Sequence, residues 1–479
     1  MTNIITKIFN KLLYLCTILF IFEMFIGFNG KMLILLGTPI RYILFGIVFS
    51  GLLVKTIINL VTEITYITTK ESHPCYKEKV RINKISIFID LVKNYFTFFD
   101  FILALFLLLN IIYVFVVPFF SGTSIIQSLK ETKAVLLVLC YFPIVILIKL
   151  NKFPWEKYRK AIKVNVILLA LVHIIFYVGE VIAGDATFVL NLFLKWEEIT
   201  YGYSQRPLVM MPKDGIRIIY STGILLVLIF YFTIDSLKIK DIAILIPLGI
   251  CAIFTTNTKS LIFGIVGGMV VIGGMLIFKH IKFKQASLFR NFIILITVTA
   301  VYAFIIDTTM FNNYVFSRIS VTFATATQNE DFSDNTMFEV SRDSQILVGT
   351  KKSNETRLIQ IKQLLNTWKE RPLFGWGYGS SAINYLRSSE EVPYIYEMTG
   401  VALLMKIGIT GIMLWLSYCL YLLWYILRNV LRNERVIAVT FIAVALGIST
   451  QFNPYLFGMP GMALLLFCFI EIKSGNLLE

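Results

Sequence analysis

Residues 356–379 read TRLIQIKQLLNTWKERPLFGWGYG, an amphipathic helical pattern followed by a glycine-rich turn. They belong to a polar segment, residues 310–395, in a chain that is otherwise dominated by long apolar runs. Apolar residues make up 57% of the 479 residues and charged residues 15%, whereas about 25% charged residues is usual in soluble domains. The sequence therefore predicts an all-α polytopic membrane protein with one large, partly helical outer loop.

The apolar runs set the expected domain organisation, because about 20 apolar residues suffice for a helix to span a bilayer. The first run is too long for the core of a signal peptide and lacks a small-residue cleavage site. We expect residues 1–309 to form nine transmembrane helices, residues 310–395 the loop, and residues 396–479 three more helices. The twelve expected spans are residues 9–28, 33–54, 97–118, 134–150, 162–183, 216–234, 241–256, 260–278, 291–309, 397–424, 436–453 and 455–472.

Basic loops indicate how the chain is oriented in the membrane. Four short loops, at residues 70–93, 149–163, 279–290 and 428–435, are rich in Lys and Arg. All four fall on one side of the twelve spans, and short basic loops are typical of the cytoplasmic side. This pattern predicts a cytoplasmic N-terminus and C-terminus, with the segment 310–395 on the periplasmic or extracellular side.

Basic residues also gather on the expected outer side, although outer loops normally carry few of them. An ordinary explanation is that they contact lipid headgroups or solvent. The alternative is an anionic ligand at the outer leaflet, for which Arg is the preferred bidentate partner of phosphate. The residues concerned are Arg206, Lys213, Arg217, Lys259 and Arg357.

Spacing within the quoted stretch predicts a helix with one apolar face. Residues 353–355 read SNE and are suited to cap its start. Pro372 is expected to end it, since proline cannot continue the hydrogen-bond ladder. Arg357 stands at the beginning of the apolar face and is either a solvated charge or a ligand-binding group.

The segment after this helix holds further candidates. The glycines of residues 375–379 could form a plain turn or allow close approach to a ligand. Trp376 and Tyr378, the aromatics between the glycines, favour stacking on sugars or a membrane-interface position, whereas Trp368 belongs to the apolar face of the helix. Glu397 stands at the start of an apolar run, where a carboxylate is either a helix N-terminal acid or a general base.

Cofactor sites find little support in the sequence. The six cysteines and three histidines are scattered without the spacing of a disulfide framework or zinc site. The sequence therefore predicts no metal and no cofactor.

Glycines recur within the expected span 260–278, which favours close helix packing.

Three segments together resemble the O-antigen polymerase and O-antigen ligase superfamily of bacterial membrane glycosyltransferases. The turn at residues 257–260 stands where the family has a Ser-Arg-Gly-like motif, with Lys259 in place of Arg. Arg357, Trp368 and the run 372–377 (PLFGWG) match an Arg, a Trp and a Pro-Leu-Phe-Gly-x-Gly signature in the large loop of the family.

The third segment departs from the ligases in a way that favours a polymerase. Ligases of this family have a His-Asn pair eleven residues before a helix glycine. Counting back from Gly408 gives Glu397 and Met398 at those positions. A carboxylate could still serve as the base.

The resemblance implies a glycosyltransferase that moves a growing glycan from undecaprenyl pyrophosphate to a lipid-linked oligosaccharide repeat unit. The reaction would take place at the outer face of the bacterial plasma membrane, with membrane lipid around it. A chain-length regulator protein is a candidate partner, and nucleic acid is not. Arg357, Lys259 and Glu397 would be catalytic, and the substrate would be bound by Arg206, Arg217, Trp368, Trp376 and Tyr378.

Other functions stay open at this point. A ligase of the same fold would transfer a finished polymer to a different acceptor. A flippase or other transporter should show two related halves and broken helices near the midplane, and the sequence shows neither. A non-catalytic assembly protein would tolerate the loss of Arg357 and Glu397. The product could be O-antigen, capsule or exopolysaccharide.

Overall fold

A computed structural model describes residues 2–26, 34–35, 38–71, 95–183, 208–211, 215–218, 223–283, 286–327, 342–387, 392–430 and 434–477. The helices are α1 (Thr2–Phe25), α2 (Ile40–Glu71), α4 (Phe98–Ile111), η1 (Ile112–Val116), α5 (Val117–Ser121), α6 (Ile125–Thr132), η2 (Lys133–Cys140), α7 (Tyr141–Lys149), α8 (Trp155–Ala183), η3 (Gly223–Leu226), α10 (Val227–Ser236), α11 (Ile239–Thr256), α12 (Lys259–Phe283), α13 (Ala286–Met310), α14 (Tyr314–Thr327), α15 (Arg342–Glu370), α16 (Thr399–Val430), α17 (Glu434–Phe452) and α18 (Met459–Leu477). Two antiparallel hairpins pair β1 (Ile34–Leu35) with β2 (Thr38–Pro39) and β3 (Leu208–Met211) with β4 (Gly215–Ile218).

Helices long and apolar enough to cross a membrane dominate the described residues, where ten such spans are found. Two of them are continuous runs of several elements, α4 to α5 (Phe98–Ser121) and α6 to α7 (Ile125–Lys149). The start of the expected span 216–234 is wrong, because residues 215–218 form β4 and the apolar helix runs over Gly223–Ser236; the expected span 455–472 corresponds to α18. The chain is thus an all-α polytopic membrane protein, as the sequence predicts.

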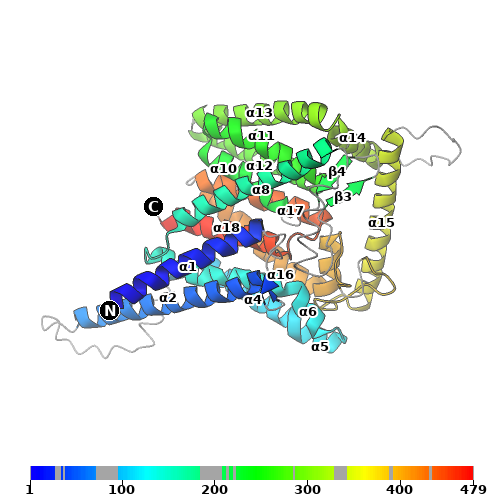
Figure 1. Cartoon of the computed structure of the whole chain (residues 1–479). Coiled ribbons are helices and arrows are strands. Elements are labelled where there is room, and N and C mark those ends of the chain that lie inside the picture. The colour runs from blue at the N-terminus through cyan, green and yellow to red at the C-terminus, as the bar shows by residue number, and fades with distance from the viewer. Residues whose placement is uncertain are drawn as a thin grey trace.

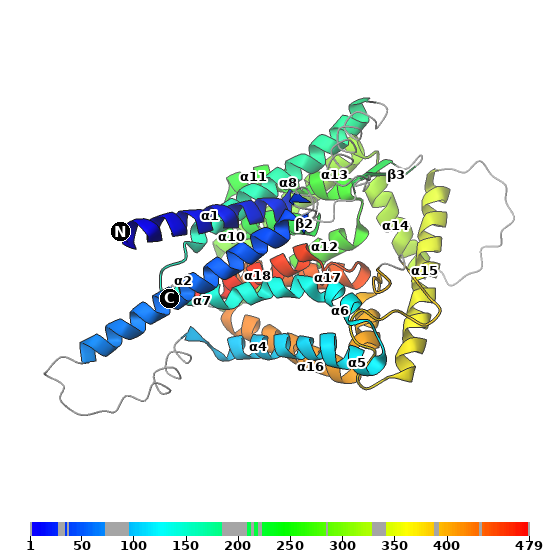
Figure 2. The same ribbon diagram turned by 60° about the horizontal axis from the view of Figure 1, so that its bottom comes forward.

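The helix bundle has two distinct ends (Figures 1 and 2). One end, here called the terminal end, carries the start of α1 and the end of α18. The opposite end, here called the loop end, carries α14 and α15, and α15 runs across the bundle rather than along it. Any site formed by the large loop therefore lies at the loop end.

Buried and half-buried ion pairs join helices at the terminal end. Arg159 contacts the carboxylates of Asp235 and Glu471, with 2.9 Å between its Nε and Oε1 of Glu471. Lys473 lies 2.7 Å from Asp100, and both side chains are almost fully buried. Removing one partner of such a pair leaves an uncompensated charge, so these contacts fix how α4, α8, α10 and α18 meet.

Glycines of α12 allow it to pack closely on α17, as their recurrence in the sequence predicts. A Cβ atom added to Gly264 would lie 2.5 Å from the backbone oxygen of Ala445. Close helix approach through small residues is typical of membrane proteins, in which dispersion contacts largely replace the hydrophobic effect. The α12–α17 contact helps to hold the start of α12 at the loop end.

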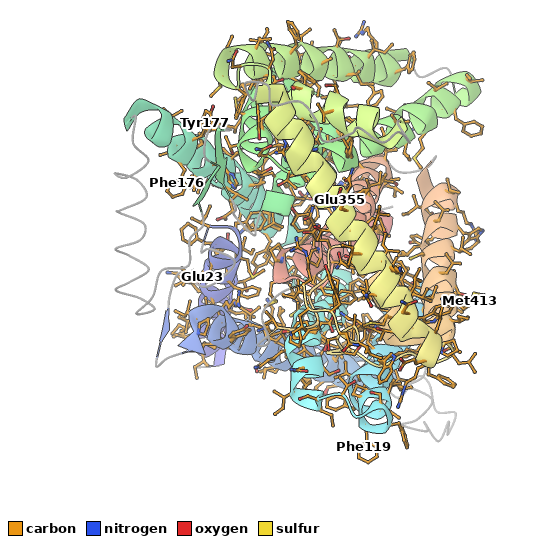
Figure 3. All side chains as sticks on the ribbon, turned by 90° about the vertical axis from the view of Figure 1, so that its right-hand side faces the viewer. Glu23, Phe119, Phe176, Tyr177, Glu355 and Met413 are labelled. Atoms are coloured by element: carbon orange, nitrogen blue, oxygen red, sulfur yellow. The ribbon has the colours of Figure 1, made fainter. Side chains whose placement is uncertain are left out.

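The loop between α13 and α16 differs in one respect from the sequence expectation. Its main helix, α15, begins at Arg342 and not at residues 353–355, which lie inside it. Ser and Asn only weakly oppose a helix that is stabilised by its surroundings. The end at Glu370, two residues before Pro372, agrees with the prediction. Figure 3 views the loop end, where α15 crosses diagonally in front, with Glu355 midway along it.

We expect Gly264→Ala to lower the apparent melting temperature of the purified protein in detergent. The added methyl group forces α12 and α17 apart, and overpacking of this kind typically costs about 1–3 kcal/mol. Gly274→Ala is the matched control, because no atom lies within 4 Å of the position its Cβ would take. Equal melting temperatures for the two variants would contradict the close α12–α17 contact.

Candidate functional site at the loop end

Helix α16 is broken at Gly408, whose φ of 62° and ψ of −172° are not helical. The break exposes backbone groups that a continuous helix would satisfy, and lipid offers no replacement partners. The glycine-rich segment supplies them instead. Trp376 and Gly377 donate their N–H groups to the carbonyl oxygens of Met405 and Lys406, at 3.1 and 2.8 Å.

The same pairing continues on the other side of the break. The N–H groups of Ile409 and Thr410 donate to the carbonyl oxygens of Pro372 and Leu373, at 2.9 and 3.0 Å. The segment 372–377 thus lies against α16 on both sides of Gly408. The proline–glycine signature is therefore the part of the loop that docks it onto the bundle.

The three alternating glycines each adopt a left-handed backbone, with φ of 70°, 85° and 80° at Gly375, Gly377 and Gly379. A Cβ on Gly377 would lie 2.6 Å from Pro118, and one on Gly375 would lie 2.5 Å from the carbonyl of Lys406. The sequence left two explanations for these glycines, a plain turn or close approach to a ligand, and the left-handed backbone of the turn accounts for them. Their close approach is to this chain's own helices.

The aromatic residues of this segment are also used in packing. Trp368 and Trp376 pack against a buried cluster that includes Leu364 and Tyr396. Trp376 donates its indole N–H to the carbonyl of Thr367 at 2.9 Å. Tyr378 is 2% exposed and its hydroxyl donates to Asn110 at 3.0 Å, and burial raises its pKa well above the usual range. Sugar binding by the three aromatics stays a prediction.

Glu397 accepts hydrogen bonds from two arginines. The Nε of Arg357, on α15, lies 3.1 Å from one carboxylate oxygen, and the Nη2 of Arg387 lies 2.6 Å from the other. All three side chains are partly exposed, between 25% and 40%. The structure therefore brings together Arg357 and Glu397, two candidates that are forty residues apart in the sequence.

Lys259 belongs to a neighbouring cationic group. It begins α12 directly after a turn in which Asn257 has a left-handed backbone. Its Nζ lies 2.5 Å from the hydroxyl of Thr322 on α14. Arg318, also on α14, donates to the backbone oxygen of Asn257 at 3.3 Å and to its side chain. The charges of Arg318 and Arg357 both act on Lys259, so three helices bring three cations together.

Arg318 and Arg387 are site residues that the sequence reasoning missed. For Arg318 a signal exists, because Tyr314, Arg318 and Thr322 recur at four-residue spacing and so share one helix face. The guanidinium of Arg318 lies over the ring of Tyr314, 5.5 Å from its centroid. Nothing comparable marks Arg387, which lies in an irregular segment.

Three of the cations listed from the sequence are not placed at the site. Arg206 and Lys213 lie outside the described residues. Arg217 lies on β4, where its backbone pairs with Val209 of β3, and its side chain is outside the described part. Among the described residues, no group of three His, Cys, Asp or Glu side chains is placed to hold a metal ion.

We expect Gly408→Ala to destabilise the docking of the loop. An alanine is strained at this φ and ψ, and its methyl group would collide with the backbone of Leu373. Limited proteolysis should show faster cleavage within residues 371–398, together with a lower melting temperature. Gly447→Ala, with no neighbour within 4 Å, should behave as the parent protein. An unchanged cleavage rate in Gly408→Ala would show that the break in α16 is dispensable.

Comparison with known proteins gives a match to one family model. Residues 243–416 match the family model described as O-antigen ligase, which is less than half of the chain. The matched range includes Lys259, Arg318, Arg357, Glu397 and Gly408. No curated protein and no solved structure matches the chain. The match confirms, for residues 243–416, the resemblance to the O-antigen polymerase and O-antigen ligase superfamily read from the sequence.

Proposed function

We propose that the protein is a polysaccharide polymerase of the bacterial plasma membrane, with the loop end on the outer side. It would transfer a growing glycan from undecaprenyl pyrophosphate to a lipid-linked oligosaccharide repeat unit. The observation that carries the proposal is the cationic group of Lys259, Arg318 and Arg357 beside the carboxylate of Glu397. This transfer needs cations to stabilise the departing diphosphate and, at the same place, a carboxylate to accept a proton.

The proposed reaction forms one bond and breaks one. The oxygen of an acceptor hydroxyl attacks the anomeric carbon of the donor glycan, and the bond from that carbon to the diphosphate oxygen breaks. The electron pair leaves with the diphosphate, so negative charge develops on it. Lys259, Arg318 and Arg357 would stabilise this charge, and one well-placed donor is typically worth about 3 kcal/mol in the transition state.

Glu397 would accept the proton that the acceptor hydroxyl loses. Before substrate binds, its carboxylate holds Arg357 and Arg387 through one oxygen each. A diphosphate is a bidentate partner for guanidinium groups and carries more negative charge than one carboxylate. Binding of the donor would therefore draw the arginines toward the diphosphate and free Glu397 to act as the base.

An apolar cavity next to the cationic group supports a lipid-linked donor. It has a volume of about 640 Å³ and is lined by residues of α11, α12 and α13. Phe316 and Ile319 of α14 also line it, and Ile319 is adjacent in sequence to Arg318. A polyprenyl chain in this cavity would place its diphosphate at the cations.

The ligase function is the second candidate, since the matching family model is described as O-antigen ligase. It would use the same donor and the same cations, and only the acceptor would differ. Glu397 and Met398 stand where the resemblance expects the His-Asn pair of a ligase, and this favours the polymerase. The acceptor therefore decides between the two functions.

We expect purified protein in liposomes to form a ladder of lengthening glycans from undecaprenyl-pyrophosphate-linked repeat units alone. Arg357→Gln should lower the rate about 10²- to 10³-fold, as for the loss of one transition-state donor. Lys362→Gln, an exposed change on the same helix, should keep the parent rate. Transfer that occurs only with a different lipid or protein acceptor would establish a ligase, and no transfer with any acceptor would contradict both functions.

The role of Glu397 can be separated from that of its partners by steady-state kinetics. If Glu397 accepts the proton, Glu397→Gln should lower kcat strongly while the KM for the donor changes little. Arg387→Gln should mainly raise the KM for the donor, since its guanidinium would contact the diphosphate. If Glu397→Gln raises the KM and leaves kcat intact, the carboxylate only positions the arginines.

A further inference from the structure

A cationic cavity lies at the loop end, outside the group of Lys259, Arg318 and Arg357. It has a volume of about 270 Å³ and is lined by four cationic side chains and a single carboxylate. The cations come from α2, α6, η2 and α16, and they are Arg41, Lys130, Lys133 and Lys406. We call this cavity the Arg41 pocket.

Arg41 is the most unusual residue of the pocket. It is only 4% exposed. Its Nη2 donates to the hydroxyl of Tyr42 at 3.0 Å, and its guanidinium lies 4.7 Å from the centroid of that ring. Its Nε and Nη1 are buried and have no hydrogen-bond partner among the described residues. Buried donors of a charged group are costly when they make no hydrogen bond, so these two donors are suited to bind an anion.

The carboxylate in the pocket is already engaged. Glu131 pairs with Lys406, and it also accepts a hydrogen bond from the N–H of Gly379 at 2.6 Å. Lys406, itself 4% exposed, also donates to the carbonyl of Tyr394 at 2.8 Å. Glu131 therefore balances Lys406 and leaves the charges of Arg41, Lys130 and Lys133 without a carboxylate among the lining residues.

The Arg41 pocket shares a segment of chain with the catalytic candidates. Tyr394, Tyr396 and Thr399 line the pocket, while Glu397, between them in sequence, pairs with Arg357 and Arg387. The segment 394–399 thus contributes to two cationic sites. The family match begins at residue 243, so most of the cations of the pocket lie outside the matched domain.

We propose that the Arg41 pocket binds the diphosphate group of the second lipid-linked substrate, the acceptor. This assignment rests on the proposed polymerase function, in which donor and acceptor both carry a diphosphate. The acceptor reacts through a sugar hydroxyl, so its own diphosphate must be held away from the reacting carbon. A pocket of this size is smaller than the usual cavity for a drug-sized ligand and suits a compact anion rather than a glycan.

The test counts binding sites with farnesyl diphosphate as the probe. Full-length protein in nanodiscs of neutral lipid is titrated and examined by native mass spectrometry and calorimetry. We expect two bound probes on the parent protein. Arg41→Gln should weaken one site about ten- to hundredfold, as for the loss of charge-assisted hydrogen bonds, and Arg357→Gln should weaken the other.

Two further variants guard against misfolding and non-specific effects. Lys133→Gln changes an exposed side chain of the pocket and should weaken the same site as Arg41→Gln while the melting temperature stays unchanged. Lys362→Gln should leave both sites intact. If Arg41→Gln and Lys133→Gln both retain two sites of parent affinity, the pocket is not a diphosphate site.

Two competitors identify the source of the anion. Displacement of the probe by phosphatidylglycerol at the Arg41 pocket, with equal affinity, would show a general lipid-headgroup site and overturn the acceptor assignment. Tight binding of inorganic pyrophosphate with no preference for the prenyl form would likewise overturn it. We expect the prenyl diphosphate to bind more tightly than either competitor.

Kinetics separates this proposal from the proposed function. In the polymerisation assay Arg41→Gln should raise the KM for the repeat unit as acceptor at least tenfold and leave the donor KM unchanged. Glycan synthesis with an unaltered acceptor KM in Arg41→Gln would refute the pocket and spare the polymerase. Two probe sites without any glycan synthesis would refute the polymerase, while the pocket would remain as a diphosphate site.

Discussion

The architecture of the loop end depends on one constraint, the backbone break in α16 at Gly408. Within a membrane protein the freed N–H and C=O groups need partners from the chain itself. The segment 372–377 provides them on both sides of the break. Its pairing with α16 fixes where α15 ends, and therefore where Arg357 is presented. It also leads the chain directly into the segment that carries Arg387 and Glu397. The geometry of the site therefore depends on the hydrogen bonds that satisfy the backbone groups freed at Gly408.

Buried cations are paired differently at the two ends of the bundle. At the terminal end Arg159 meets two carboxylates, and the buried Lys473 meets Asp100. At the loop end Glu397 is shared by two arginines, and the Arg41 pocket contains four cations and one carboxylate. A structural ion-pair network needs balanced partners to offset desolvation. Buried or half-buried cations that outnumber the carboxylates beside them, as at the loop end, are instead what an anionic substrate would neutralise.

The sequence predicts those features that arise from local composition. Apolar runs predict the spans because length and hydropathy suffice for a helix in lipid, and Pro372 predicts the end of α15 because proline blocks the next turn. The break at Gly408 is not predictable in this way, since the apolar pattern continues through it and only the docked segment makes it favourable. The start of α15 was predicted wrongly from residues 353–355, because capping residues are also tolerated inside helices.

The residues of the candidate site also fall into those that local sequence predicts and those that only tertiary contacts reveal. Lys259 and Glu397 are candidates from the sequence because each stands at a helix boundary, and Arg357 because it precedes the apolar face of a helix. Arg387 could not be recognised because it lies in an irregular segment, and the Arg41 pocket because its lining residues are far apart in the sequence. No local sequence pattern marks Arg41. It stands out as a candidate anion-binding residue only once its burial and its two donors without hydrogen bonds are known.

Two cationic sites that share one segment also bear on the choice between polymerase and ligase. Both reactions need one site for the departing diphosphate. Only the polymerase needs a second diphosphate site, since its acceptor is again a prenyl diphosphate, whereas a ligase acceptor can be any membrane-anchored glycan. The segment 394–399 would connect the two cationic sites. Movement of Glu397 on donor binding would also shift Tyr394 and Tyr396, which line the Arg41 pocket. Such a connection would let the occupied donor site influence acceptor binding through a few residues of backbone.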